Sequence, residues 1–301
     1  MKFLDLFAGI GGFRLGMESA GHECVGFCEI DKYARASYKA IHNTEGEIEL
    51  HDITRVTDES IRGFGSVDVI CGGFPCQAFS IAGHRRGFED TRGTLFFEIC
   101  RFASILRPKY LFLENVRGLL NHDGGATFET IVRTLDGLGY DVEWQVLNSK
   151  NFGVPQNRER VFIIGHLGND CPSEVLYRPN QSEQSIVRLG NLLKTDSFGG
   201  NPQRGRVYSP DGLSPTVTCI KGGGQEPKIL LSRNPNVIRK LTPREFWRLQ
   251  GFTDEQFETC AKIQSDAQLY KQAGNSVSIP IVYELGKNII EYHRRLHEYV
   301  D

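Results

Sequence analysis

The stretch DLFAGIGGFRLG, residues 5–16, joins an apolar strand pattern (2–7) to a helical pattern (13–20) through a glycine-rich turn. Such a turn between a strand and a helix is typical of the first unit of an α/β sheet. Ligands of open α/β sheets bind at the carboxyl ends of the strands, where glycine lets the backbone approach them closely. The spacing Gly9-x-Gly11-Gly12 is not GxGxxG, which weakens a dinucleotide-binding interpretation.

The same alternation continues through the first half of the chain and predicts a mostly parallel sheet surrounded by helices. Further strands are expected at 23–28, 67–71, 110–115, 142–148 and 160–166. Further helices are expected at 31–42, 94–107 and 126–138.

The composition changes at about residue 168, where Gly, Pro, Ser, Asn and Gln become frequent and strand signals shorten. Apolar residues still recur, so this region is expected to be a second, smaller domain of short strands and loops rather than disordered. Thr242, Pro243 and Glu245 mark the start of a capped helix, and a last helix at 279–297 is expected to pack back on the sheet. The predicted domains are therefore 1–167 with about 265–301, and about 168–264.

Composition excludes several classes of protein. The chain has 301 residues, of which 40% are hydrophobic, and no apolar run approaches the roughly 18 residues that cross a bilayer. The eight cysteines form no CxxC pair and no secretory leader is evident, so reduced thiols, a cytoplasmic location and no metal are expected. The net charge is −2, so any nucleic-acid site must come from local clusters of Lys and Arg.

Two acidic residues in the first part of the chain could contact a cofactor. Glu29 follows the strand 23–28 and could accept hydrogen bonds from ribose hydroxyls, and Asp52 could serve a base ring in the same way. Each alone is better explained as a solvated acid. Together with the glycine turn, they favour an adenosine-bearing cofactor.

The segment VDVICGGFPCQAFS (67–80) places a thiol at this same edge. Pro75 restricts the backbone before Cys76, and a cysteine attacks as the thiolate. Taken alone, Cys76 would be a structural thiol. The nearest arginines in sequence, which could contact phosphates, are Arg85, Arg86 and Arg92.

Two more strand ends carry charged side chains. Glu114 ends the apolar strand YLFLEN, where an acid must be satisfied by loop N–H groups or have a function. Arg158 and Arg160 share one face because side chains alternate along a strand. Two guanidinium groups so placed suit phosphate or carbonyl recognition, and a salt-bridged strand edge is the alternative.

In this order, the motifs resemble those of the bacterial and phage DNA (cytosine-5) methyltransferases over nearly the whole chain. The matching segments are DLFAGIGG, Glu29, Asp52-Ile53, GGFPCQAFS, GTLFFE, ENVRG, QNRERVF, RKLTPRE with RLQGF, and QAGNSVSIP. The resemblance implies a Rossmann-like class I methyltransferase sheet domain with a smaller target-recognition domain. It also implies that the enzyme binds S-adenosylmethionine and releases S-adenosylhomocysteine.

The family pattern assigns roles to individual residues. Cys76 would add to C6 of cytosine, Glu114 would hold the N3 and amine side of the ring, and Arg160 would contact the base carbonyl. Arg158 would support the same pocket or a nearby phosphate, and Pro75 would shape the loop. The expected cofactor residues are Phe7, Ala8, Gly9, Ile10, Gly11, Gly12, Glu29, Ile30, Asp52, Ile53, Leu95, Asn275 and Val277. At position 30 the family often has an aromatic residue, so stacking on adenine would be weaker here or come from Phe7.

The resemblance also implies duplex DNA as substrate, with the target cytosine flipped out of the helix. Loop 77–92 would close over the base, and Arg206 could read a guanine edge. The expected DNA contacts are Gln77, Ser80, Arg85, Arg86, Arg92, Arg206, Thr216, Val217, Gly222, Gly223 and Gly224. The short recognition region suggests one target sequence. A monomer is expected because one catalytic set and one recognition domain suffice, and a cognate restriction endonuclease is a candidate partner.

Three alternatives remain at this point. The tRNA cytosine methyltransferases share these motifs, but their Cys-Phe-Thr tripeptide is absent here. A catalytically silent DNA-binding protein is disfavoured by the intact Cys76, Glu114, Arg158 and Arg160. A nicotinamide oxidoreductase with a reactive cysteine is disfavoured by the missing GxGxxG.

Overall fold

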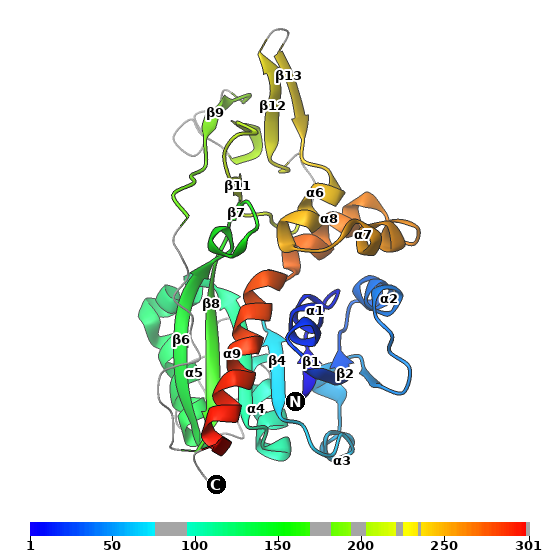
Figure 1. The fold of residues 1–301 in the computed structure, drawn as a ribbon, viewed down its shortest axis with the longest axis vertical. Helices are drawn as coiled ribbons and strands as arrows, with labels where there is room; N and C mark the ends of the chain where they lie inside the picture. Colours follow the sequence, from blue (N-terminus) through cyan, green and yellow to red (C-terminus); the bar gives the residue numbers. More distant parts are fainter. Residues whose placement is uncertain (76–94, 169–181, 194–202, 221–224, 234–235, 299–301) are drawn as a thin grey trace.

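A large mixed sheet forms the lower half of the molecule (Figure 1). The computed structural model describes residues 1–75, 95–168, 182–193, 203–220, 225–233 and 236–298. The sheet has the order β3-β2-β1-β4-β5-β8-β6, in which β8 runs antiparallel to both of its neighbours and the other adjacent pairs are parallel. Its strands are β1 (Lys2–Leu6), β2 (Glu23–Cys28), β3 (Ile48–Leu50), β4 (Val69–Gly73), β5 (Tyr110–Val116), β6 (Tyr140–Asn148) and β8 (Glu159–Leu167).

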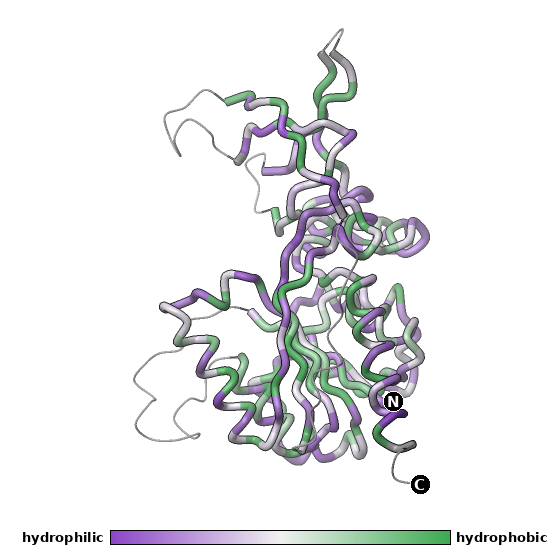
Figure 2. Tube along the Cα trace, turned by 60° about the vertical axis from the view of Figure 1, so that its left-hand side comes forward, coloured by the Kyte–Doolittle hydropathy of each residue, from purple (hydrophilic) through white to green (hydrophobic). Residues whose placement is uncertain are grey.

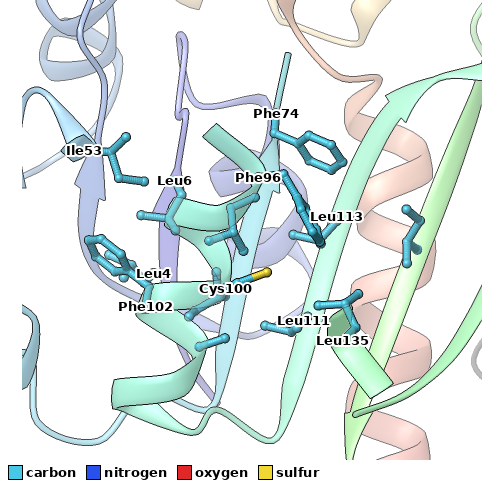
Figure 3. Close-up of a cluster of buried hydrophobic side chains, with 14 of the residues drawn as sticks. Leu4, Leu6, Ile53, Phe74, Phe96, Cys100, Phe102, Leu111, Leu113 and Leu135 are labelled. Carbon is cyan, nitrogen blue, oxygen red and sulfur yellow. The ribbon is translucent and has the colours of Figure 1, made fainter. Parts of the chain in front are cut away.

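Helices cover both faces of this sheet. The side chain of Phe3 packs with α1 (Gly12–Ser19) and α9 (Ile279–Glu298). Its neighbours Leu4 and Leu6 point to the opposite face, towards α3 (Asp58–Arg62), α4 (Leu95–Leu106) and α5 (Ala126–Gly137), as Figure 3 shows in part. This alternation follows from the period of two in a strand, and it buries hydrophobic side chains on both faces. The helix α2 (Lys32–Ile41) stacks Tyr38 on Phe27 of β2.

The expected class of fold is confirmed, and each strand and helix predicted for the first half is present within a few residues. The strand predicted at 67–71 is found at Val69–Gly73, because Gly72 and Gly73 pair with Leu113 and Glu114 of β5. The sequence did not indicate β3 and α3, which have only three and five residues.

A second group of strands lies at the top of Figure 1. Four of them form the sheet β13-β12-β10-β9, and β11 pairs with β7, which lies just above the large sheet. Their bounds are β7 (Gln156–Asn157), β9 (Arg188–Asn191), β10 (Arg206–Tyr208), β11 (Ser214–Pro215), β12 (Lys228–Arg233) and β13 (Asn236–Lys240). The short strands expected for this region are therefore confirmed.

Three helices, α6 (Pro243–Gln250), α7 (Asp254–Ala261) and α8 (Asp266–Asn275), lie between the two sheets (Figure 1). The predicted cap of α6 is confirmed, since Thr242 and Glu245 form a reciprocal capping box. The buried side chains of these helices form one cluster with Ile10 and Ala34 of the lower half and Val217 of the upper half. This cluster attaches the helices to the glycine-rich turn.

Hydrophobic residues are concentrated in the strands of the large sheet, whereas the upper strands and helix surfaces are mixed (Figure 2). Within the described residues, no helix combines the length and hydrophobicity required to cross a bilayer.

Candidate functional site

The carboxyl ends of the parallel strands open into a cavity of about 350 Å³. Its walls come from the segments that follow β1 and β2, from the first turn of α2, from the carboxyl ends of β4 and β5, from the start of β8, and from the end of α8. They are Phe7, Gly9, Ile10, Glu29, Asp31, Ala34, Gly73–Pro75, Glu114–Val116, Arg158, Arg160, Lys271, Gln272, Gly274 and Asn275. A site at this edge is what the first turn of the sequence predicted.

The turn after β1 is shaped by left-handed backbone. Phe7, Gly9 and Gly11 have φ angles of 56°, 57° and 84°. A Cβ on Gly9 would have no atom within 4 Å, whereas a Cβ on Gly11 would lie 2.0 Å from His42 Nε2. Gly9 therefore leaves open space, and Gly11 allows α2 to pack closely against the turn.

Glu29 closes one side of the cavity. Its Oε2 accepts a hydrogen bond from the Gly9 N–H at 2.8 Å, and Oε1 accepts one from the Asp31 N–H at 2.7 Å. Burial raises the pKa of Glu29, although both hydrogen bonds oppose that shift. The carboxylate is thus fixed at the end of β2, beside the turn.

Five of the predicted cofactor residues line the cavity, namely Phe7, Gly9, Ile10, Glu29 and Asn275. The others do not contribute to its described wall: Ala8, Gly11, Gly12, Ile30, Asp52, Ile53, Leu95 and Val277. Ile30 is 67% exposed, whereas Ile53 and Val277 belong to the hydrophobic core. Asp52 caps the short helix at Ile53–Arg55 through Thr54.

Glu114 and Arg160 form an ion pair in the opposite wall. Arg160 Nε lies 3.0 Å from Glu114 Oε1, and that oxygen accepts no hydrogen bond of good geometry from the described residues. Burial raises the pKa of Glu114, and the attraction of Arg160 and then Arg158 opposes the rise. Burial is the larger effect, so this carboxyl group holds a proton more readily than an exposed glutamate does.

Arg158 is 2% exposed and ties three backbone segments together. Its guanidinium group donates to the carbonyl oxygens of Val217 at 3.0 Å, Gly274 at 3.3 Å and Ser276 at 2.8 Å. Burial and the neighbouring Arg160 lower the pKa of Arg158 to about 9, which leaves it charged at neutral pH. Of the two roles expected for Arg158, the structure supports the pocket rather than a phosphate contact.

The predicted DNA contact at Val217 is wrong for its side chain. Val217 is fully buried, and its N–H donates to Gln156 Oε1 at 2.9 Å. The hydroxyl of the neighbouring Thr216 donates to the Asn157 carbonyl at 2.7 Å. Thr216 and Val217 thus hold their segment against residues 156–157. The predicted DNA contact Arg206 lies half-buried on β10.

Sequence reasoning assigned no role to Asn115, although the ENV motif contains it. Its Nδ2 donates to the Phe74 carbonyl at 2.8 Å, and its Oδ1 accepts from the Val116 N–H at 2.8 Å. Asn115 thereby holds the chain just before Pro75, which lies in the cavity wall. Lys271 was also missed, and its amine pairs with Asp31 at 2.5 Å.

The remaining predicted residues lie outside the described ranges. They are Cys76, Gln77, Ser80, Arg85, Arg86, Arg92, Gly222, Gly223 and Gly224.

Comparison with known proteins identifies the family. Residues 1–197 and 178–291 match the family model "C-5 cytosine-specific DNA methylase". The chain belongs to this family. The DNA methylase is 38% identical to type II methyltransferase M.HpaII of Haemophilus parainfluenzae, over 98% of this chain and 91% of that protein. It is 36% identical to type II methyltransferase M.HhaI of Haemophilus parahaemolyticus, over 96% and 94%.

The fold of the DNA methylase agrees with that assignment. The S. pombe Dnmt2 methyltransferase superposes with a TM-score of 0.71 and 20% identity, over 97% of this chain and 98% of that one. The chain is therefore a DNA (cytosine-5) methyltransferase, as the sequence motifs predicted.

Proposed function

We propose that this DNA methylase methylates C5 of a cytosine flipped out of one short duplex sequence, through a covalent bond between Cys76 and C6. The observation that carries the proposal is the pair Glu114 and Arg160 in the cavity wall, at the strand edge where Pro75 leads to Cys76. A carboxyl group and a guanidinium group that are largely shielded from water at this edge are suited to holding a polar ring.

The methyl donor we propose is S-adenosylmethionine. The open space beside Gly9 and the fixed carboxylate of Glu29 suit a ligand with a ribose, and the cavity of about 350 Å³ offers room for it. When bound, it would supply the electrophilic methyl group that the activated C5 attacks, leaving S-adenosylhomocysteine. We assign its contacts to Phe7, Gly9, Ile10, Glu29 and Asn275, with Asp52 and Ile53 at the adenine side.

The Cys76 thiolate would attack C6 and form a carbon–sulfur bond, which moves the electron pair of the C5–C6 double bond towards C5. Glu114, whose pKa is raised by burial, would share a proton with N3 and neutralise charge that develops on the ring. Arg160 would donate to the base carbonyl. Once C5 carries the methyl group, a base would remove the C5 proton, the C5–C6 double bond would re-form, and the carbon–sulfur bond would break to restore the thiolate.

Asn115 would act before this step, as a positioning residue. Its bond to the Phe74 carbonyl holds the backbone that enters Pro75, so the ENV segment supports the chain just before the proposed nucleophile. This contact joins the two motifs that the sequence placed at neighbouring strand ends.

The wider assignments are also proposals. We infer a catalytic part at 1–167 with about 265–301, and a target-recognition part at about 168–264. Arg206 would read a base edge, and the loop 77–92 would close over the flipped cytosine. The type II names of the similar methyltransferases support a cognate endonuclease as a partner. We expect a monomer that works in the cytoplasm, where the DNA lies.

The decisive experiment measures transfer of labelled methyl groups to duplex DNA and covalent capture by duplexes that contain 5-fluorocytosine. Cys76→Ala should abolish both, because the nucleophile is gone, while Cys260→Ala, which removes a buried thiol elsewhere, should retain them. Methyl transfer by Cys76→Ala would exclude the proposed nucleophile. Methylation of tRNA alone would exclude the DNA substrate.

A further inference from the structure

Gln156 joins three segments that are distant in the sequence. Its side chain is fully buried. The Nε2 group donates to the Leu249 carbonyl of α6 at 2.8 Å, and Oε1 accepts from the Val217 N–H at 2.9 Å. One amide thereby connects β7, the end of α6 and the small-domain segment 214–218.

Residues 214–217 of this segment are each attached to residues 155–157 by backbone pairing or hydrogen bonds. Ser214 and Pro215 pair in parallel with Gln156 and Asn157, and the Ser214 N–H donates to the Pro155 carbonyl at 2.8 Å. Beyond them, the Thr216 and Val217 contacts described above continue the attachment. The segment also crosses α8 closely, since a Cβ on Gly274 would lie 2.2 Å from the Thr218 carbonyl carbon.

This attachment leads directly to the cytosine pocket. Gln156 precedes Arg158 by two residues, and Arg158 holds the Val217 carbonyl at 3.0 Å while it lines the cavity. Arg160, two residues further, pairs with Glu114. The position of segment 214–218 relative to Glu114 is therefore determined by a continuous run of buried contacts.

We propose that Gln156 is a positioning residue that keeps the DNA-reading part of the small domain in fixed register with the cytosine pocket, and so contributes to target discrimination. The inference rests on the proposed function. Replacement of Gln156 by an apolar side chain leaves the Val217 N–H and the Leu249 carbonyl without buried partners, and the segment can then shift to satisfy them. The segment that reads the target bases would then no longer hold one particular cytosine at the entrance to the pocket.

The test compares Gln156→Met with Gln250→Met. Gln250 is a matched control because it is also fully buried and donates to the Ala273 carbonyl at 2.8 Å, but it has no contact with segment 214–218 among the bonds described. Methylation rates are read by bisulfite sequencing at the target site and at sites that differ by one base pair. A single mismatch costs roughly 1–3 kcal/mol, so partial loss of register should lower the ratio of the two rates about tenfold.

The expected result is a reduced ratio for Gln156→Met, an unchanged ratio for Gln250→Met, and cofactor affinity within about twofold of the wild type in both. Equal losses of rate at all sites in both variants would show a merely structural role and overturn the proposal. If Gln156→Met fails to fold, hydrogen exchange of the Val217 N–H in the wild type tests the proposal instead. Rapid exchange there would overturn the proposal, because the bond to Gln156 would not hold the segment in place. Failure of the proposed function is separate, because the wild type would then not methylate DNA.

Discussion

Glu114 shows how burial decides the chemistry of one residue. Two guanidinium groups favour its ionised form, but the cost of removing a carboxylate from water is larger, and the pKa is raised. A protonated carboxyl group can donate to a ring nitrogen, which an ionised one cannot. The ion pair with Arg160 would then loosen as the base enters. The site thus places a proton donor beside two guanidinium groups.

Replacement of Glu114 by Gln should lower the rate of methyl transfer by roughly 10²–10⁴-fold, the usual contribution of a positioned acid or base. The amide fits the same space but cannot transfer a proton. Wild-type single-turnover rates should fall as the pH rises through the raised pKa of Glu114, because the protonated form is lost. The Gln variant should lack that dependence.

Methyl-transfer rates measured across pH, with cofactor affinity measured in parallel, check this prediction. Asp68→Asn is the control and should keep the wild-type profile, because Asp68 is half-buried at the amino end of β4, away from the cavity at the carboxyl ends. An unchanged rate in Glu114→Gln would remove Glu114 from the proton transfer.

At the scale of elements, the sequence predicted the strands and helices whose positions follow from local hydrophobic patterns and capping residues. Short apolar runs located β1, β5 and β8, and the Thr242 capping box located α6. The strands β7 and β11 have two residues each, so no period exists to read, and only pairing between distant segments creates them. For the same reason, Val217 looked like a recognition residue until the fold buried it. Asn115 was missed because its bond to Phe74 spans two strands.

The turn between β1 and α1 offers a contrast between two glycines. Gly11→Ala should destabilise the protein by several kcal/mol, because its Cβ would overlap His42 in addition to the left-handed strain. Gly9→Ala meets no neighbour, so only the strain of roughly 1–2 kcal/mol remains, and the methyl group enters the cavity. Thermal unfolding and equilibrium binding of S-adenosylmethionine separate the two effects.

The expected pattern is a large loss of stability for Gly11→Ala and mainly a loss of cofactor affinity for Gly9→Ala. Normal affinity in a folded Gly9→Ala variant would show that the cofactor does not approach this turn.

At the scale of the molecule, the cavity is assembled from the two ends of the chain. The turn after β1 supplies Phe7–Ile10, and α8 supplies Lys271–Asn275, about 260 residues later. Two hydrogen bonds of Gln272, which lines the cavity, hold α8 to α2: Ser37 donates to Gln272 Oε1 at 3.1 Å, and Gln272 Nε2 donates to the Tyr33 carbonyl at 3.2 Å. A ligand in the cavity therefore contacts both the sheet edge and the helices that carry the small domain.

S-adenosylhomocysteine at about 100 times its dissociation constant should raise the free energy of unfolding by about 2.7 kcal/mol, since it binds only the folded chain. Because α8 forms part of the wall, hydrogen exchange should slow in residues 266–275 as well as in the turn at 7–12. Gly9→Ala is the control and should show little of either effect at the same ligand concentration. Slower exchange in the turn alone would show that the ligand contacts the sheet edge but not α8. Cofactor binding could then not stabilise the helices next to the small domain before DNA binds.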